Sequence, residues 1–222
     1  MDFDLKNIFK QLSFNTFIPF VYPMMMLPLR SWRKRAIHMC SFKPADRVLI
    51  PGVGSGYDLP YLPADVEVDG IDISEVMLGI AAAKHRLHGD GRNIRLSIMD
   101  AENLDFPANT FDKAILDLFL TCVYDPQKAF SEVVRVMKPN GEILIYDHLL
   151  RTNKWTGMIM SHMDTVMKYS FCSVIRPFDD IIKGHPVEVV KEIKGDPLGF
   201  IRGFLLRKIA PKKINPWWWL KI

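Results

Sequence analysis

A glycine-rich loop follows the first apolar run of the chain. Residues 48–50 read Val-Leu-Ile and predict a buried strand. They lead into Gly52-Val53-Gly54-Ser55-Gly56, in which three glycines stand at alternate positions. Because glycine has no side chain, a ligand can approach such a backbone closely. The loop therefore predicts a binding site.

The spacing in sequence between this loop and the carboxylate of Asp72 is informative. Asp72 ends the next apolar run, in Gly70-Ile71-Asp72-Ile73-Ser74, and lies 20 residues after Gly52. This spacing places a carboxylate at the tip of the neighbouring strand, where it can bind both hydroxyls of a ribose. Loop and carboxylate together predict a nucleoside-containing cofactor, with Ile73 beside it.

Polar residues follow the third predicted strand as well. Asp100-Ala101-Glu102 would lie at the same edge of the sheet. A carboxylate there can accept a hydrogen bond from an adenine amino group, while a neighbouring backbone N–H addresses the ring. The glycine motif alone would also suit dinucleotide enzymes, but three binding positions in this order favour a nucleoside cofactor. The alternative is that Asp72 and Asp100 are solvated strand ends.

Strands and helices alternate along the chain and predict a parallel sheet covered on both faces. Ser74 and Asp125 are expected to cap two of the helices, and Pro126 to occupy a first helical position. The last two strands are expected to form an antiparallel hairpin across residues 195–199. The predicted strands are 48–51, 66–71, 94–99, 113–119, 142–146, 187–194 and 200–209, and the predicted helices are 58–62, 75–86, 126–137 and 154–171.

Composition narrows the class of protein. The chain has 222 residues, of which 49% are hydrophobic and 24% charged, so it can bury a sizeable core. A net charge of +4 does not demand a nucleic-acid partner. The three cysteines form no metal-binding pattern, and we expect buried thiols in a reducing compartment rather than disulfides. No secretory signal is recognised, so a cytoplasmic location is predicted.

The first 45 residues predict contact with a membrane surface. Residues 12–29 carry no charge, but Pro19, Pro23 and Pro28 argue against a spanning helix. A broken apolar segment beside basic residues is typical of proteins that lie on anionic membranes. The alternative is an amphipathic helix that caps the active site and leaves its basic residues solvated. The basic residues are Arg30, Arg33, Lys34 and Arg35.

The C-terminus repeats this combination of basic and apolar residues. Lys212 and Lys213 precede three tryptophans at 217–219, and indole rings favour the headgroup level of a membrane. The alternative is that one or two of them pack on the domain. We expect an N-terminal membrane-contact and cap segment (1–45), one α/β domain (46–210) and a tryptophan-rich tail (211–222).

The span 46–148 resembles a class I S-adenosylmethionine-dependent methyltransferase. The glycine loop is similar to the first cofactor motif of that family, and residues 70–74 to its ribose motif. Residues 99–107 with 110–112 are similar to the adenine-side motif, and residues 133–142 to the helix and turn before the fifth strand. The resemblance implies a Rossmann-like, seven-stranded, mostly parallel sheet with a C-terminal antiparallel hairpin. It implies S-adenosyl-L-methionine as cofactor, bound by Gly52, Val53, Gly54, Ser55, Gly56, Asp72, Ile73, Asp100, Ala101, Glu102 and Asp117.

Within that family the chain is most similar to bacterial phospholipid N-methyltransferases and related quinone methyltransferases, through residues 56–63 and the N-terminal segment. This implies an apolar or lipid-like acceptor, first of all a phospholipid amino group, on the inner face of the membrane. A quinone, thiol or other small hydrophobic acceptor is the alternative, as is a protein that binds the cofactor without methyl transfer. A nucleic-acid substrate is not expected, because no base-flipping motif is present.

One residue departs from the family pattern. Ile50 stands at the end of the first strand, where the family usually has an acidic residue that helps to orient the cofactor. The methionine ammonium must then be held by other groups. The backbone carbonyls of Gly52 or Leu116 could do so, as could the side chain of Asp117.

Methyl transfer from a sulfonium is an in-line displacement, in which the protein supplies alignment and a dry site. An amine acceptor must be neutral, and His148 after the fifth strand is placed to take its proton, or else to make a structural hydrogen bond. The resemblance also implies that Tyr22 in the N-terminal segment could close over the cofactor; the alternative is that it packs against the membrane or the core. Tyr124 borders the pocket, and Arg151 and Arg176 are candidates for binding a phosphate head group, if they are not ordinary surface arginines.

Overall fold

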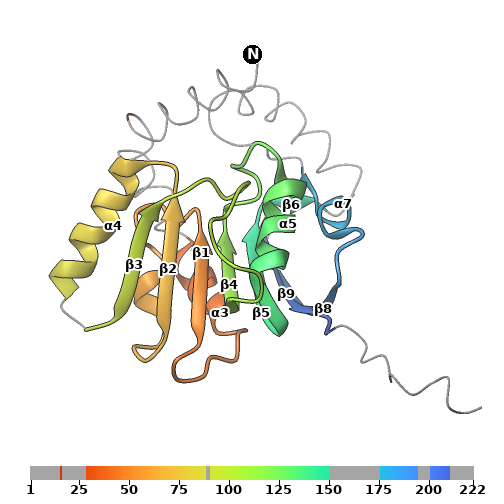
Figure 1. Cartoon of the computed structure of the whole chain (residues 1–222), viewed down its shortest axis with the longest axis horizontal. Coiled ribbons are helices and arrows are strands. Elements are labelled where there is room, and N and C mark those ends of the chain that lie inside the picture. The colour runs from red at the N-terminus through yellow and green to blue at the C-terminus, as the bar shows by residue number, and fades with distance from the viewer. Residues whose placement is uncertain (1–15, 17–28, 89–90, 151–175, 195–200, 211–222) are drawn as a thin grey trace, which may run out of the picture.

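Seven strands form one sheet in the described part of the chain, in the order β3-β2-β1-β4-β5-β9-β8 (Figure 1). The computed structural model describes residues 16, 29–88, 91–150, 176–194 and 201–210. The strands are β1 (Arg47–Pro51), β2 (Glu67–Asp72), β3 (Asn93–Ile98), β4 (Phe111–Asp117), β5 (Met137–Asp147), β8 (Val187–Lys194) and β9 (Arg202–Lys208). A separate small pair consists of β6 (Leu149–Leu150) and β7 (Arg176–Pro177).

The sheet is parallel except at one side. The neighbours from β3 to β5 pair in parallel. β9 pairs antiparallel with both β5 and β8, so β8 and β9 are the predicted hairpin. The predicted α/β fold is confirmed, and parallel strands of this kind bring their carboxyl ends to one edge of the sheet.

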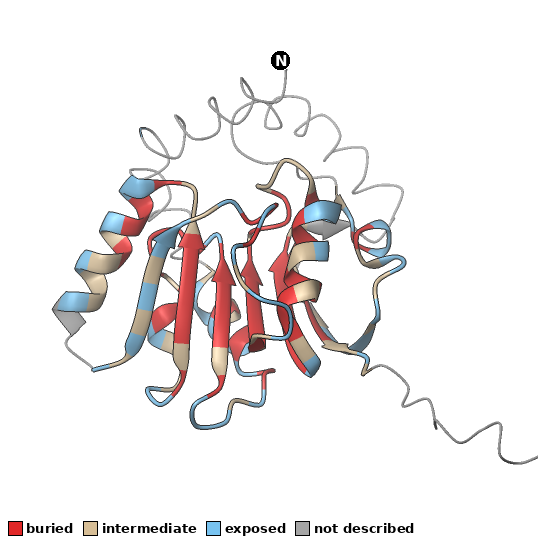
Figure 2. Cartoon of the chain, in the orientation of Figure 1, coloured by how far each residue is buried: buried red, intermediate tan, exposed pale blue. Residues whose placement is uncertain are grey.

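Helices cover both faces of this sheet. Successive side chains of a strand point to opposite faces, so Leu49 and Leu116 belong to one core with α5 and α7. Val48 and Ile115, their chain neighbours, belong to a second core that holds side chains of α3 and α4. Figure 2 shows buried residues gathered along the central strands. The helices are α3 (Arg30–Ile37), α4 (Glu75–His88), α5 (Pro126–Val136) and α7 (Phe178–Ile182), with a 3-10 turn η1 (Leu59–Tyr61).

Two predicted helix caps are present. The Oδ1 of Asp125 accepts a hydrogen bond from the backbone N–H of Lys128 at 2.9 Å, and Pro126 follows at the first helical position. The Oγ of Ser74 accepts from the N–H of Met77 at 3.2 Å. Both caps satisfy backbone donors that a helix start leaves unpaired. They fix where α4 and α5 leave the carboxyl edge of the sheet.

The sequence prediction was wrong about the turn at 138–141. The structure includes these residues in β5, which begins at Met137 and pairs there with Phe111. The pairing is interrupted between Phe111 and Lys113, and Asn140 adopts a φ of 64° within the extra length. The chain thus turns inside an irregular strand rather than between a helix and a strand. The predicted helix 154–171, the hairpin connection 195–199, most of residues 12–29 and Trp217–Trp219 lie outside the described residues.

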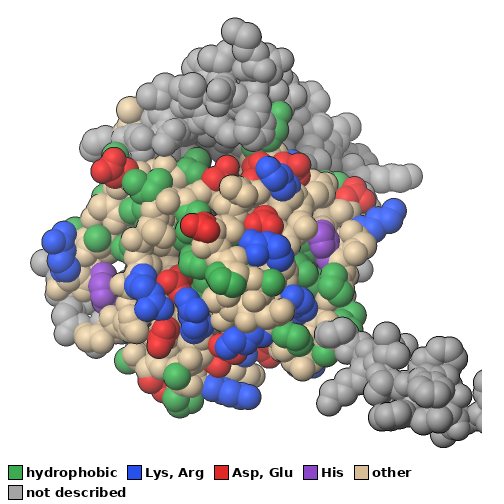
Figure 3. All heavy atoms as spheres, viewed as in Figure 1, with side chains coloured by type: hydrophobic (Ala, Val, Ile, Leu, Met, Phe, Trp, Pro, Cys, Tyr) green, Lys and Arg blue, Asp and Glu red, His purple; other side chains and the backbone are tan. Residues whose placement is uncertain are grey.

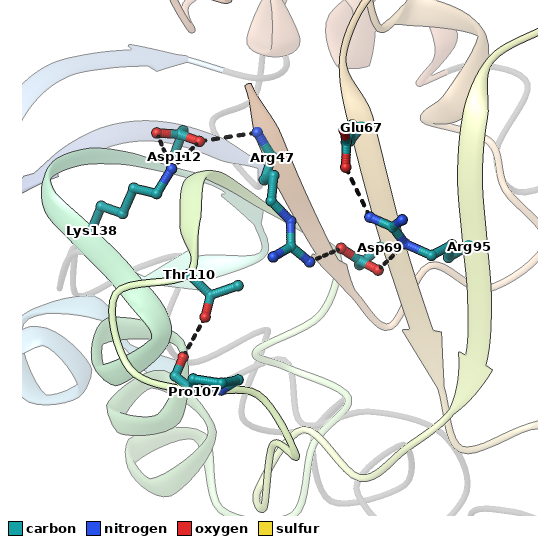
Figure 4. Close-up of polar contacts among 8 residues, drawn as sticks. All are labelled: Arg47, Glu67, Asp69, Arg95, Pro107, Thr110, Asp112 and Lys138. Atoms are coloured by element: carbon teal, nitrogen blue, oxygen red, sulfur yellow. Dashed lines mark hydrogen bonds and ion pairs between the residues drawn. The ribbon is translucent and has the colours of Figure 1, made fainter. Parts of the chain in front are cut away.

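Positive and negative side chains are mixed over the face seen in Figure 3. Several charged side chains pair at the amino ends of the strands. A guanidinium nitrogen of Arg47 lies 2.8 Å from Asp69, which also accepts from Arg95 at 2.9 Å. Arg95 reaches Glu67 at 3.0 Å (Figure 4). Because Arg47 and Glu67 begin their strands, this chain of ion pairs joins β1, β2 and β3 at the end opposite the glycine loop.

Candidate functional site

The glycine loop and Asp72 are joined by a hydrogen bond. The backbone N–H of Gly54 donates to Oδ2 of Asp72 at 2.9 Å, and the N–H of Ser74 donates to Oδ1 at 2.9 Å. Since β1 and β2 are parallel neighbours, their carboxyl ends place the two groups side by side. A carboxylate has about four acceptor sites, so Asp72 can still accept a hydrogen bond from a hydroxyl group of a ligand.

The loop adopts a backbone that requires glycine. Gly52 has a φ of +66°, and a Cβ placed on it would lie 2.7 Å from Cδ2 of Phe119. Gly54 and Gly56 also have positive φ values, of +53° and +76°. L residues with side chains rarely adopt such angles. The loop therefore presents bare backbone at the carboxyl edge, which fits the close approach of a cofactor.

Burial and hydrogen bonding act in opposite directions on Asp72. Burial raises the pKa of its carboxyl above the ordinary value, whereas the backbone N–H groups of Ser74, Gly54 and Ile73 lower it. Three backbone donors therefore surround this carboxylate and fix its orientation. A fixed acceptor of this kind is suited to the vicinal hydroxyls of a ribose.

The residues after β3 are divided between the surface and the interior. Asp100 is exposed, and its Oδ1 accepts from the N–H of Glu102 at 2.9 Å. Ala101 and Glu102 are buried. One Glu102 oxygen accepts from the N–H of Asp125 at 2.8 Å, while Oε2 is buried and has no hydrogen-bond partner within the described ranges. Burial raises the pKa of Glu102. Glu102 thus ties the end of β3 to the loop before α5.

Asp117 lies at the end of β4 in an ion-pair cluster that the sequence reading did not foresee. The Nε of Arg33, on α3, donates to Oδ2 of Asp117. The same nitrogen lies 3.0 Å from Oδ1 of Asp58, just after the glycine loop. All three side chains are less than a tenth exposed. Burial raises the pKa of Asp58 well above its ordinary value, the Asp117 carboxylate raises it further, and Arg33 lowers it.

The spacing of apolar residues along α3 could have predicted that Arg33 points inwards. Leu29, Arg33, Ala36 and Ile37 are spaced so that they share one helix face, and that face packs on the sheet. Arg33 is therefore the only one of the four basic residues at 30, 33, 34 and 35 that belongs to the inward-facing stripe. Arg30, Lys34 and Arg35 are exposed. Asp58 gave no comparable signal, because a short polar turn after a glycine loop usually faces solvent.

Position 50 lies in the core. Ile50 is 1% exposed and packs in the same core as Ile37 of α3. Next to the glycine loop, the ring of Tyr57 lies near two cations. The guanidinium carbon of Arg33 is 5.7 Å from its ring centroid, and Nζ of Lys84 is 4.0 Å from the same centroid. Lys84 also donates to the carbonyl oxygen of Ser55 at 3.1 Å. Charged groups around the glycine loop therefore come from α3, α4, β4 and the loop itself.

His148 follows β5 at the carboxyl edge of the sheet and is partly buried. Its backbone N–H donates to Oδ1 of Asp147 at 2.7 Å. Asp147 is fully buried and also accepts from the N–H of Thr121 at 3.1 Å and from its hydroxyl at 2.7 Å. The Asp147 carboxylate thus ties β5 to the loop after β4 and fixes the backbone on which His148 stands.

Arg176 is brought to this edge by a short strand pairing. β7 pairs with β6, and Arg176 is opposite Leu149, the residue after His148. One of its Nη atoms donates to the carbonyl oxygens of Val123 at 3.2 Å and Tyr124 at 3.4 Å. Its Nε is buried and has no hydrogen-bond partner in the part of the chain that the structure describes. The structure thus brings Arg176, Tyr124 and His148 together. Tyr22 and Arg151 lie outside the described residues.

None of the described helices combines the length and the apolar character that crossing a membrane requires. The exposed side of α3 carries basic and aromatic side chains. Nε of Arg30 donates to the hydroxyl of Tyr61 at 3.1 Å, and the guanidinium carbon of Arg35 lies 4.7 Å from the ring centroid of Trp32.

Comparison with known families identifies the central part of the chain. Residues 49–145 match a family model described as a methyltransferase domain. This range contains the glycine loop, Asp72, Asp100–Glu102 and Asp117, and it ends just before Asp147 and His148.

Characterised relatives carry methyltransferase names. A phosphatidylethanolamine N-methyltransferase of Cereibacter sphaeroides is 40% identical over 105 residues, which are 47% of this chain and 52% of the relative. A demethylmenaquinone methyltransferase of Symbiobacterium thermophilum is 32% identical over 118 residues, 51% of this chain and 47% of the relative. The chain thus matches about half the length of these relatives.

A solved structure shows the same fold. A SAM-dependent methyltransferase of Methanosarcina mazei superposes with a TM-score of 0.64 at 22% identity, covering 79% of this chain and 97% of that protein. Residues 49–145 are a methyltransferase domain, and the resemblance to class I S-adenosylmethionine-dependent methyltransferases is confirmed. The Rossmann-like fold and S-adenosylmethionine as the cofactor class of this domain are confirmed with it.

Proposed function

We propose that this protein transfers a methyl group from S-adenosylmethionine to an apolar or lipid-like acceptor at a membrane surface, and that the acceptor is the amino group of a phospholipid. The observation that carries the proposal is the 40% identity to a phosphatidylethanolamine N-methyltransferase, together with a methyltransferase domain over residues 49–145. The geometry supports it, because the glycine loop and Asp72 form one hydrogen-bonded unit at the carboxyl edge.

The chain's own residues suit the parts of this cofactor. Asp72 would hold the ribose hydroxyls, and the bare backbone from Gly52 to Gly56 would lie against the rest of the nucleoside. Asp100 and Ala101 would lie on the adenine side, with Ile73 beside the ribose and Glu102 fixing the loop that follows. When bound, S-adenosylmethionine supplies a methyl group on a sulfonium that is already activated for transfer.

The acceptor amine must lose its proton before it can act as a nucleophile. We assign proton acceptance to His148, which stands on a backbone anchored by Asp147 at the carboxyl edge. Nearby, Tyr124 and Arg176 would line the acceptor side, with Arg176 contributing a guanidinium to the phosphate of a head group. In the same scheme Tyr22 closes over the cofactor and Arg151 is a second phosphate ligand.

The division of the chain follows from the same proposal. Residues 1–45 would contact the inner face of the membrane and cap the site, 46–210 would carry out the chemistry, and the tail from 211 would add a second membrane contact. The exposed Arg30, Lys34 and Arg35 support this, since basic residues near an apolar segment attract anionic lipids.

A quinone acceptor is the second candidate. It is favoured by the relative that methylates demethylmenaquinone, at 32% identity. A quinone has no phosphate, so its methylation should not depend on Arg176, whereas methylation of a phospholipid should. Replacement of Arg176 therefore distinguishes the two acceptors.

The test is transfer of labelled methyl from S-adenosylmethionine into extracted membrane lipids, with a quinone precursor and a water-soluble thiol in parallel reactions. The same reactions are repeated with Arg176→Gln and with His148→Gln. We expect label in an aminophospholipid, reduced at least 10-fold in both variants.

The other outcomes each change the assignment. Label in the quinone precursor alone, unaffected by Arg176→Gln, would assign the protein to quinone methylation. Label in the thiol alone would point to another small hydrophobic acceptor. Cofactor binding without label in any acceptor would indicate a protein that uses S-adenosylmethionine for a purpose other than methyl transfer.

A further inference from the structure

Three charged side chains meet in the interior beside the glycine loop. Arg33 is 2% exposed, and its Nε contacts carboxylates from two different parts of the chain. Asp117 is the last residue of β4, and Asp58 follows Gly56 by two positions. The cluster thus joins α3 to both loops that border the cofactor edge.

The charges of this cluster do not balance. One guanidinium faces two carboxylates: Oδ1 of Asp58 lies 3.0 Å from Nε of Arg33, and Oδ1 of Asp117 is buried with no hydrogen-bond partner among the described residues. Buried carboxylates are normally hydrogen-bonded or matched by a cation, because an uncompensated buried charge is costly. The pKa of Asp58 is accordingly raised, by burial first and by the neighbouring Asp117 second. Among the described residues the cluster therefore pairs two buried carboxylates with a single cation, which leaves room for a second positive group.

The position of the cluster relative to the loop indicates what that group is. The strands run in the order β2-β1-β4, so the loop after β1 has Asp72 on one side and Asp117 on the other. Phe119, two residues after Asp117, lies against Gly52. If the ribose is held at Asp72, a substituent on its 5′ carbon that crosses the loop would reach β4, because β4 lies on the other side of β1. In S-adenosylmethionine that substituent ends in an amino acid with an ammonium group.

Position 50 cannot supply a carboxylate for this ammonium, because it holds a buried isoleucine. We propose that Asp58 and Asp117 together bind the ammonium of the cofactor's amino-acid end, and that Arg33 is the positioning residue that holds the two carboxylates side by side. The inference rests on the proposed function, since it concerns the same cofactor. It adds two residues, Arg33 and Asp58, to the cofactor site and ties α3 to cofactor binding.

A structural role and a binding role make opposite predictions for Asp58→Asn. The variant leaves one guanidinium opposite one carboxylate, so the free protein should unfold at the same temperature as the original or at a higher one. The ammonium would lose one of its two carboxylates, so affinity for S-adenosylhomocysteine should fall at least 10-fold. A residue that only stabilised the fold would instead lower the unfolding temperature.

The test uses two thioethers that share the nucleoside and differ in the amino-acid end. S-adenosylhomocysteine carries that end, and 5′-methylthioadenosine lacks it. Binding of each is measured by calorimetry to the full chain and to Asp58→Asn, Asp117→Asn and Arg33→Lys, together with thermal unfolding. We expect each variant to bind S-adenosylhomocysteine at least 10-fold more weakly and to bind 5′-methylthioadenosine within 2-fold of the original protein.

Glu142→Gln is the matched control. Glu142 is also a buried carboxylate paired with a cation, at 2.8 Å from Nζ of Lys113, but it lies in the part of β5 away from the loop. The Glu142→Gln variant should have a lower unfolding temperature, and its affinities for S-adenosylhomocysteine and 5′-methylthioadenosine should keep the same ratio as in the original protein.

Two results would overturn the inference. One is an equal loss of both thioethers in the aspartate variants, which would mean that the cluster only shapes the loop. The other is unchanged binding of S-adenosylhomocysteine by Asp58→Asn and Asp117→Asn. Failure of the unaltered protein to bind either thioether would instead overturn the proposed function itself.

Discussion

The amide of Gly54 donates a hydrogen bond of 2.9 Å to the carboxylate of Asp72, so the loop after β1 and the end of β2 form one unit. The second oxygen of Asp72 accepts from Ser74, the residue that caps α4. The orientation of this carboxylate is therefore set by two backbone segments at once, before any ligand binds. Such preorganisation favours binding because less ordering remains to be done.

Replacement of Asp72 by asparagine should weaken every nucleoside ligand. The amide nitrogen of asparagine cannot accept from Gly54 or from a ribose hydroxyl, so one acceptor is lost. We expect affinity for both S-adenosylhomocysteine and 5′-methylthioadenosine to fall by about 10- to 100-fold, as for a hydrogen bond to a charged group. Calorimetric titration measures both. Asp65→Asn, at an exposed position just before the amino end of β2, is the control and should change neither affinity.

Two glycines in different surroundings test whether the backbone of the glycine loop requires glycine. Gly52 has a φ of +66° and no room for a Cβ, whereas a Cβ on Gly79, in α4, would meet nothing within 4 Å. Gly52→Ala should lower the free energy of unfolding by about 1–3 kcal/mol and impair cofactor binding. Gly79→Ala should raise that free energy by about 0.5–1 kcal/mol, because alanine favours a helix. Urea unfolding measures both, and an equal effect of the two substitutions would contradict this account.

The ion pair between Lys138 and Asp112 should make stability depend on pH. Burial acts to raise the pKa of Asp112, but hydrogen bonds from Lys138 and from the backbone of Arg47 outweigh it, so the pKa is lowered overall (Figure 4). A carboxyl whose pKa is lower in the folded state stabilises the fold above its unfolded pKa, and this contribution is lost as pH falls through the folded value.

Lys138→Gln tests this pH dependence. At pH 7 it should lower the free energy of unfolding by up to about 1 kcal/mol, the usual range for a partly exposed pair. In acid below the lowered pKa of Asp112, where this carboxyl is protonated in both proteins, the difference should vanish. Urea titrations at the two pH values provide the measurement. Lys191→Gln, at an exposed position of β8, should have no effect at either pH; a Lys138→Gln deficit that persists in acid would rule out the ion pair as its cause.

Much of this fold can be predicted from the sequence, because local sequence signals and the tertiary structure agree. The apolar run of β1, the caps Ser74 and Asp125, and the spacing from Gly52 to Asp72 each follow from rules that act over a few residues. The irregular start of β5 was missed because Pro139 and Asn140 suggest a free turn. Only pairing with a distant strand makes these residues part of the sheet.

The cluster of Arg33, Asp58 and Asp117, in contrast, was not predicted from the sequence. Arg33 stands among basic neighbours and suggests a solvated face, and its inward position follows only from the apolar stripe that it shares with Leu29, Ala36 and Ile37. Its partners lie 25 and 84 positions further along the chain, at Asp58 and Asp117. No local pattern relates residues at such separations, since the fold of the sheet alone brings them together.

The reactivity of Cys40 should differ strongly from that of Cys122. Burial raises the pKa of the Cys40 thiol from 9.0 to about 12, with a smaller contribution from Glu142, whereas Cys122 is partly exposed. Because the thiolate is the reactive species, this shift lowers its amount at pH 8 roughly a thousandfold. Brief treatment with iodoacetamide should leave Cys40 unmodified in the folded protein and modify it in urea. Peptide mass spectrometry gives the extent at each cysteine, and rapid modification of Cys40 in the folded protein would show that α3 opens readily.

Membrane affinity should depend on which basic residues are replaced, and not only on how many positive charges the protein loses. Lys34 and Arg35 are exposed on α3, next to the aromatic ring of Trp32. Each basic residue near an anionic surface contributes about 1 kcal/mol, so Lys34→Gln with Arg35→Gln should weaken binding roughly 30-fold. Co-sedimentation with vesicles of equal parts phosphatidylglycerol and phosphatidylcholine measures this. The control, Lys183→Gln with Lys191→Gln, removes the same charge from exposed positions on another part of the molecule and should have little effect. Equal losses in the two double variants would mean that net charge, and not the exposed side of α3, determines binding.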